Sequence, residues 1–180
     1  MNLLGIDLGT GSAKALLMTP EGAVVGEASV PYPVHSAQPG WAETHPDEWW
    51  SALQACVREA VAGRPVAGIG LSGQMHGVVL VDDAGAVLRP AVLWADTRSD
   101  RLLDRYRALP AAHLARLANP AAAGMAGPTL LWMREHEPAL LARARWALQP
   151  KDWLRYRLTG QVGAEPSDAS GTLLYDLSCD

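Results

Sequence analysis

The residues best suited to chemistry lie near the N-terminus, in the run Gly5-Ile6-Asp7-Leu8-Gly9-Thr10-Gly11-Ser12. Backbone N–H groups of a glycine-rich turn, here at Gly9 and Gly11, can approach an anion closely, and the hydroxyls of Thr10 and Ser12 can donate to it. Asp7 could bind Mg²⁺ directly or through water, because Mg²⁺ prefers carboxylate and phosphate oxygens. The run therefore predicts either a phosphate site or only a tight hairpin with a capped aspartate.

A second group of this kind is Trp94-Ala95-Asp96-Thr97-Arg98, which follows a predicted strand. Trp94 could stack on the C–H face of a polyol while Asp96 accepts hydrogen bonds from its hydroxyls. Alternatively, Trp94 belongs to the core and Asp96 is the N-cap of a helix over 98–108, and both interpretations can hold together. His76 lies between small residues at a strand end, where loops meet ligands, although a lone histidine is more often structural.

Two further patterns match known motifs without their structural context. The run Gly68-Ile69-Gly70-Leu71-Ser72-Gly73 has the spacing GxGxxG, but its glycines lie within a predicted strand and no helix follows, so a dinucleotide site is not expected. Ser72, His76 and Asp96 lack the GxSxG elbow of a hydrolase triad. The five histidines have no spacing typical of a zinc site.

The elements that must position these groups can be read from the apolar pattern. Apolar stretches over 3–8, 13–18 and 23–30, joined by short glycine-containing turns, predict an antiparallel meander. A proline- and glycine-rich segment over 31–45 predicts a surface loop, and a helix follows from Thr44 to Pro46 onward, with Thr44 and Asp47 spaced as a capping box and Gly63 at its end. Further along we expect a strand over 66–71, a hairpin of 77–81 with 87–94, and mainly helices beyond 97, with Pro128, Pro138 and Pro150 as helix starts.

Composition excludes several classes of protein. The chain has 180 residues, a net charge of −4, 49% hydrophobic and 19% charged residues, which is typical of a globular domain and too apolar for disorder. A mildly acidic chain has no basic surface for nucleic acid, and no apolar run is long enough to span a membrane. Cys56 and Cys179 form no CxxC pair and no signal peptide is evident, so we expect free thiols in a cytoplasmic protein.

Six motifs, taken together and in order, resemble the FGGY carbohydrate kinases, and the resemblance covers essentially the whole chain. It implies a ribonuclease-H-like α/β fold of the actin, hexokinase and Hsp70 superfamily, with a mixed five-stranded sheet whose antiparallel meander is followed by α and β elements. The first motif is shared across that superfamily, whereas the second and fourth are more specific. The motifs are Gly5-Ile6-Asp7-Leu8-Gly9-Thr10, Gly73-Gln74-Met75-His76-Gly77, Trp94-Ala95-Asp96-Thr97-Arg98, Pro150-Lys151-Asp152-Trp153-Leu154-Arg155, Leu158-Thr159-Gly160 and Ser167-Asp168-Ala169-Ser170-Gly171-Thr172.

The resemblance implies a reaction in which the 5-hydroxyl of D-xylulose attacks the γ-phosphate of MgATP, giving D-xylulose 5-phosphate and ADP. By motif match, Asp7 lies near Mg²⁺ and the transferring phosphoryl group, and Gly9 to Ser12 face the phosphates. Met75 and His76 contact the sugar, with Trp94 and Asp96 around the same cleft. Such a transfer depends on positioning and charge neutralisation rather than on covalent catalysis.

Intact members of that family are much longer, with a second, nucleotide-binding domain and a general-base aspartate that falls beyond Asp180. We therefore expect residues 1–180 to be an N-terminal, sugar-binding domain that is truncated at its C-terminal side. We expect this domain to have no kinase activity of its own and to be able to self-associate as a homodimer. Two alternatives remain at this point: a kinase for another ketopentose or polyol, and a non-enzymatic actin-like nucleotide-binding module.

Overall fold

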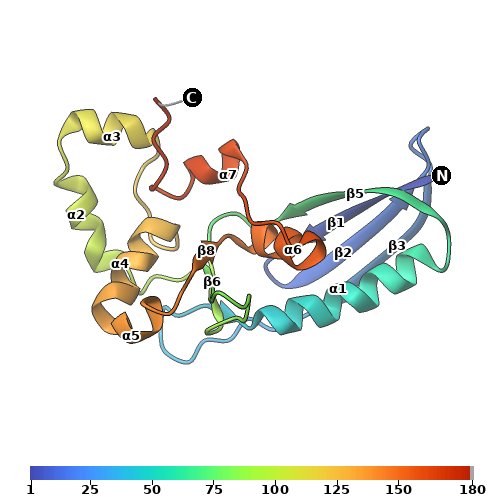
Figure 1. The fold of residues 1–180 in the computed structure, drawn as a ribbon, viewed down its shortest axis with the longest axis horizontal. Coiled ribbons are helices and arrows are strands. Elements are labelled where there is room, and N and C mark those ends of the chain that lie inside the picture. The colour runs from blue at the N-terminus through green and yellow to red at the C-terminus, as the bar shows by residue number, and fades with distance from the viewer. Residues whose placement is uncertain (179–180) are drawn as a thin grey trace. The chain divides into compact units, whose positions relative to one another are not determined.

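The computed structural model describes residues 1–178, which form two compact units (Figure 1). The first unit comprises Met1–Val34 and Thr44–Gln74, and the second comprises His35–Glu43 and the chain from Met75 onward. A short strand, β4 (Glu43–Thr44), spans one boundary between them. The first unit has a sheet and the helix α1 (Pro46–Val61), and the second has short strands and the remaining helices of residues 1–178. Each unit holds one of the two groups of residues that the sequence singles out.

The first unit is built on a four-stranded mixed sheet in the order β3-β2-β1-β5. β1 pairs antiparallel with β2 and parallel with β5, and β2 pairs antiparallel with β3, so the predicted meander followed by a returning strand is confirmed. The strands are β1 (Asn2–Leu8), β2 (Ser12–Met18), β3 (Val24–Pro31) and β5 (Val66–Gly73).

The five-strand count is wrong for the residues that the structure describes. β5 is an edge strand there, because the next strand that forms a ladder, β6 (Val79–Val81), pairs antiparallel with β8 (Trp146–Leu148) instead of joining the first sheet. The two glycine-rich turns of the meander and the parallel return of β5 nevertheless reproduce the predicted architecture.

Helix α1 (Pro46–Val61) covers one face of this sheet (Figure 1). Alternate residues of β1, namely Leu4, Ile6 and Leu8, are buried, as expected for a strand with one face against a helix. From the helix side, Trp49 and Cys56 are fully buried. The thiol of Cys56 is free and donates to the carbonyl of Ala28 at 3.1 Å, so it is part of the helix–sheet packing.

The predicted capping box of α1 is wrong, although Pro46 does begin the helix. His45 is the N-cap, and its Nδ1 accepts a hydrogen bond from the N–H of Asp47 at 3.3 Å. Thr44 is buried and donates its hydroxyl to the Pro33 carbonyl at 3.0 Å, so it is engaged elsewhere. The helix ends with Ala62 in the left-handed region at φ 46°, one residue before Gly63.

In the second unit, the predicted hairpin is present in a reduced form. Residues 77–81 and 87–94 pair at the isolated antiparallel bridges Val78–Val92 and Val81–Val87, and the N–H of Leu88 donates to the carbonyl of Leu80 at 3.0 Å. In addition, β6 forms a ladder with β8, a strand that the sequence pattern did not predict. The third strand of this region is β7 (Ala91–Val92).

Helices make up the rest of the second unit, as predicted beyond residue 97. Pro138 and Pro150 begin their helices as expected, whereas Pro128 lies inside the first turn of a helix that starts at Ala126. Within residues 1–178, no helix is long and apolar enough to cross a membrane. The elements are η1 (Asp100–Leu102), α2 (Leu103–Arg107), α3 (Ala111–Leu117), α4 (Ala126–His136), α5 (Pro138–Leu141), α6 (Pro150–Thr159) and α7 (Pro166–Ser170). Cys179 lies outside the described residues.

Candidate functional site

In the first unit, Asp7 stands on the face of the sheet that α1 does not cover. Strand register places it between Ser72 of β5 and Lys14 of β2, and a parallel row places Gly5 between Gly70 and Leu16. A hollow of about 800 Å³ opens over these residues. It is lined by residues 5–7, 14–16, 27–29 and 70–72, all of which belong to the first unit.

The glycine-rich hairpin follows Asp7 directly and joins β1 to β2. The N–H of Gly9 donates to the carbonyl of Ser12 at 3.0 Å, which closes a turn with Thr10 and Gly11 at its tip. One carboxylate oxygen of Asp7, Oδ2, lies 3.9 Å from the point where a Cβ on Gly9 would stand. The structure therefore brings Asp7 and the hairpin together, as predicted.

The donor set fits Mg²⁺ held together with a polyphosphate. Among residues 1–178 no cluster of three or more histidine, cysteine or acidic residues could hold a metal by itself. The carboxylate of Asp7 borders the hairpin, and Mg²⁺ is commonly held by one or two carboxylates, its remaining ligands being phosphate oxygens and water.

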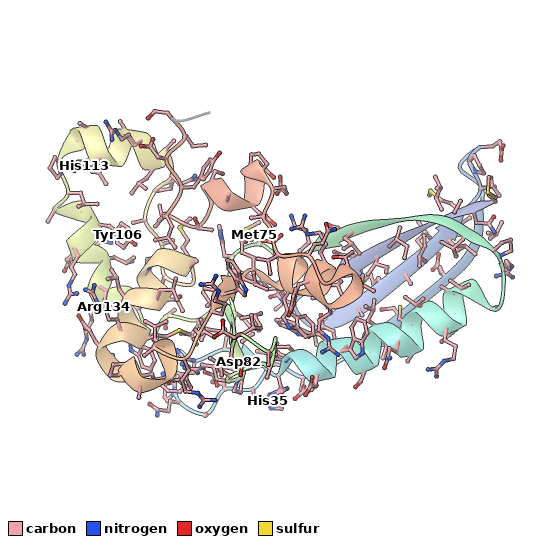
Figure 2. The ribbon with its side chains drawn as sticks, viewed as in Figure 1. His35, Met75, Asp82, Tyr106, His113 and Arg134 are labelled. Carbon is pink, nitrogen blue, oxygen red and sulfur yellow. The ribbon has the colours of Figure 1, made fainter. Side chains whose placement is uncertain are left out.

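In the second unit, Met75, His76 and Gly77 form a sharp turn immediately after β5. His76 has φ 56° and Gly77 φ 75°. Met75, which is labelled in Figure 2, is 59% exposed. The N–H of Gly77 donates to the carbonyl of Gly124 at 3.1 Å. Backbone in the left-handed region is uncommon outside glycine and clusters at functional positions, so the turn at His76 is a candidate binding feature.

Trp94 is tied to this turn through the same glycine. Gly124 has φ 78° and packs so closely that a Cβ there would collide with the carbonyl oxygen of Trp94. The indole of Trp94 is 47% exposed, which is unusual for a side chain of its size. The backbones of Gly77 and Trp94 thus meet at Gly124, a residue that no local sequence pattern marks.

The imidazole of His76 is backed by the end of α7. A Cβ built on Gly171 would lie 2.9 Å from Cε1 and 3.1 Å from Nδ1 of His76. Two residues of the same segment are also fixed: Thr172 accepts a hydrogen bond from the N–H of Gly127 at 2.8 Å, and Asp168 accepts one from Gln149 at 2.7 Å. Gly171 is therefore a further residue of the site, and only its place in a family-like motif could have drawn attention to it.

Asp96 is in the same unit, but its carboxylate faces inward. It is 1% exposed, and Oδ2 accepts from the N–H of Ala42 and from Nη2 of Arg98, both at 2.7 Å. Its Oδ1 accepts from the N–H and Nε of Arg98 at 2.9 and 2.8 Å. The predicted N-cap role is wrong in position, because the helical segment starts only at Asp100 with Ser99 as N-cap.

Arg98 is the centre of a buried charged cluster. Its guanidinium carbon lies 3.7 Å from the ring centroid of Trp41 and 5.0 Å from that of Trp132, a cation–π arrangement, and Nη2 also donates to Glu43 at 2.7 Å. Burial disfavours the charge, but hydrogen bonds to Asp96 and Glu43 outweigh it and raise the pKa of Arg98. Asp96 and Arg98 thus form a buried ion pair that packs against Trp41 and Trp132.

A second charged cluster fixes α7. Nζ of Lys151 lies 2.7 Å from Oδ2 of Asp168 and 3.2 Å from Oε1 of Glu165. The carboxylate of Glu165 caps the helix by accepting from the N–H groups of Ser167 and Asp168 at 3.0 and 2.7 Å. Hydrogen bonds from the Ser167 hydroxyl and from these N–H groups lower the pKa of Glu165 to about 2.

Comparison with known proteins identifies the family to which this chain belongs. The family model described as "FGGY family of carbohydrate kinases, N-terminal domain" matches residues 2–179, so the chain belongs to the FGGY family of carbohydrate kinases. The match includes the hairpin of the first unit and the His76 turn of the second, and it confirms the family that the sequence motifs indicated.

Individual relatives extend this finding. The chain is 37% identical over 178 residues to a xylulose kinase of Klebsiella pneumoniae and 38% identical over 182 residues to that of Bacillus subtilis, covering 97% and 98% of this chain. A solved structure of a xylulose kinase from Brucella ovis (its title spells the sugar "xyloylose") superposes with a TM-score of 0.93 at 40% identity, over 98% of this chain. The chain spans only 37%, 36% and 37% of these three proteins' own lengths.

Proposed function

We propose that this chain is the sugar-binding part of an ATP-dependent kinase that phosphorylates D-xylulose at its 5-hydroxyl. The observation that carries the proposal is the 37–38% identity, over nearly the whole chain, to proteins named xylulose kinases. Two features of the structure support it. The hairpin beside Asp7 can bind phosphate, and the turn at His76 can bind a polyol.

On the phosphate side, Asp7 and the Gly9–Ser12 hairpin would hold the transferring phosphoryl group. Mg²⁺, when bound at Asp7, would neutralise the charge on the phosphate oxygens. The hairpin would add backbone and hydroxyl donors close to the same oxygens, because its glycines let an anion approach. Asp7 itself would fix where the phosphate lies, and positioning of this kind supplies much of the rate enhancement in phosphoryl transfer.

On the sugar side, we assign binding to Met75, His76 and Trp94. The exposed indole of Trp94 offers a flat apolar face for the C–H side of a pentulose, and His76 can donate to or accept from its hydroxyls. Asp96 is predicted in this group, and we assign it instead to holding Arg98 in the buried charged cluster, because both of its carboxylate oxygens accept hydrogen bonds from Arg98 and the residue is buried. The general base would come from beyond Asp180, as the family resemblance implies.

The test is ADP release by the full-length protein, with D-xylulose, D-ribulose and glycerol as alternative acceptors. Turnover with D-xylulose well above the other two supports the proposal. Preference for D-ribulose or glycerol would replace it with a kinase for another ketopentose or polyol. ATP binding without any sugar-dependent ADP release would favour the nucleotide-binding module instead. We further propose that the 180-residue chain alone releases no ADP with D-xylulose.

A titration of the 180-residue chain with D-xylulose, followed by tryptophan emission, isolates the sugar half of the proposal. A saturable change abolished by Trp94→Phe would show that the pocket is formed within these residues. Trp146→Phe is the matched control, since Trp146 is similarly exposed at 40% and packs with Arg145. A cytoplasmic location is consistent with a kinase that uses ATP. Both this location and the formation of a homodimer stay predictions.

A further inference from the structure

Three carbonyl oxygens at the glycine-rich hairpin, those of Gly9, Gly11 and Ser12, are engaged by one residue, Tyr32. The hydroxyl of Tyr32 donates to the carbonyl of Gly9 and lies 3.2 Å from that of Ser12, and its backbone N–H donates to the carbonyl of Gly11 at 3.0 Å. Tyr32 follows β3 directly and is 8% exposed. A single buried residue thus engages three of the carbonyls between β1 and β2.

A second buried side chain reinforces one of these contacts. Nε2 of Gln74 donates to the same Gly9 carbonyl at 3.3 Å, and the N–H of Gln74 donates to the Leu8 carbonyl at 2.7 Å. Gln74 is 8% exposed. The Gly9 carbonyl therefore accepts from two side chains of the first unit, 23 and 65 residues away along the chain.

The chemistry of Tyr32 suits a permanent donor. Burial, and then the nearby negative charge of Asp7, raise the pKa of its hydroxyl. A phenolate would also face two carbonyl oxygens, which cannot donate to it. The protonated hydroxyl is therefore the form that suits this position, because it can donate to the hairpin.

We propose that Tyr32 is a positioning residue for phosphate binding, which turns the hairpin carbonyls inward so that the turn presents N–H and hydroxyl groups to a polyanion. The inference rests on the proposed function. A carbonyl oxygen that faced a phosphate would repel it, whereas backbone N–H groups attract it. Neither motif matching nor hydrophobic periodicity marks Tyr32, since it lies in a proline-rich segment predicted as a surface loop.

The experiment compares Tyr32→Phe with Tyr106→Phe in the full-length protein. Both tyrosines are 8% exposed and both substitutions keep the ring, but Tyr106 belongs to a core cluster of the second unit (Figure 2). We expect the Michaelis constant for MgATP to rise, or kcat to fall, roughly tenfold in Tyr32→Phe, as loss of one buried hydrogen bond allows. The dissociation constant for D-xylulose should stay within about twofold, and Tyr106→Phe should change neither.

Two results would overturn the inference: unchanged MgATP parameters in Tyr32→Phe, or an equal loss of sugar and nucleotide binding, which indicates general unfolding. Equilibrium binding of a non-hydrolysable MgATP analogue by calorimetry separates it from the proposed function, because the analogue keeps the terminal phosphoryl group that the hairpin would hold. If the wild type phosphorylates none of the sugars but Tyr32→Phe still weakens binding of the analogue roughly tenfold, the function fails and the inference stands. If the wild type does not bind the analogue, the inference fails.

Discussion

Gly171 at the end of α7 lies directly against the imidazole of His76, so closely that a Cβ on Gly171 would stand 2.9 Å from Cε1. The backbone of Gly171 has φ −76°, an ordinary value for any residue. The contact, not the conformation, therefore requires glycine. Replacement of Gly171 by alanine adds one methyl group against the ring and so tests whether His76 must keep its present orientation.

We expect Gly171→Ala to weaken sugar binding by displacing the His76 ring, with a Michaelis constant for D-xylulose raised about tenfold or more. The Michaelis constant for MgATP should stay within about twofold, because the phosphate hairpin belongs to the other unit. Gly70→Ala is the matched control, since nothing lies within 4 Å of the Cβ it would introduce. An unchanged sugar constant in Gly171→Ala would show that His76 is not a sugar contact.

Replacement of Asp7 should affect turnover far more than sugar binding. In the full-length protein we expect Asp7→Ala and Asp7→Asn to lower kcat by about 100-fold or more, because charge stabilisation at the transferring group is lost. The dissociation constant for D-xylulose, measured by tryptophan emission, should change little. Glu27→Gln is the control, because Glu27 lines the same hollow without bordering the hairpin. Wild-type turnover in Asp7→Ala would refute the role assigned to Asp7.

Removal of Arg98 should destabilise the fold strongly. Arg98→Met leaves the Asp96 carboxylate, 1% exposed, without its charge partner, and breaking a buried pair in this way typically costs about 3–5 kcal/mol. The free energy of unfolding in urea is the measurement. Arg107→Ala breaks an exposed pair with Asp104 and should cost at most about 1 kcal/mol. Similar losses in the two variants would contradict the structural importance of the cluster.

The cap of α7 should respond to acid. The pKa of Glu165 is lowered from 4.5 to about 2, so its stabilising contribution is complete above pH 4.5 and is lost as the pH falls toward 2. The amide NMR signals of Ser167 and Asp168 should therefore titrate with a midpoint near that lowered value. Glu165→Gln should abolish this titration, whereas Glu59→Gln, an exposed site on α1, should leave it unchanged. A midpoint near 4.5 in the wild type would disprove the cap.

The parts of the fold with a strong local pattern were predictable from sequence. β1 was predicted as an apolar stretch that ends at a glycine-containing turn, and α1 as an apolar face that recurs with helical spacing, so both elements followed from local pattern. β8 was missed because three residues are too few to show a period, and its place is set by its partner β6. The cap at His45 replaced Thr44 because Thr44 is buried against the Pro33 carbonyl.

The residues of the candidate site also fall into those with a local sequence signal and those without one. Asp7 and its hairpin could be proposed from sequence because the carboxylate and the glycines are contiguous. Tyr32 and Gly171 carry no such local signal, because each contacts a residue far away in the chain, Gly9 and His76 respectively. For Asp96 the sequence favours a polyol contact or an N-cap, and it does not reveal that Arg98 folds back onto both carboxylate oxygens.

The labelling rate of the buried Cys56 thiol, which lies between α1 and the sheet, can measure how often the first unit opens. Burial raises the pKa of Cys56, and its side chain is fully enclosed, so a thiol-specific dye cannot reach it until the helix lifts from the strands. With Cys179 changed to serine, the labelling rate of the remaining sulfur would report how often that opening occurs. Saturating nucleotide or sugar could then be compared for their power to slow the reaction, which would reveal whether a ligand holds α1 closed on the sheet.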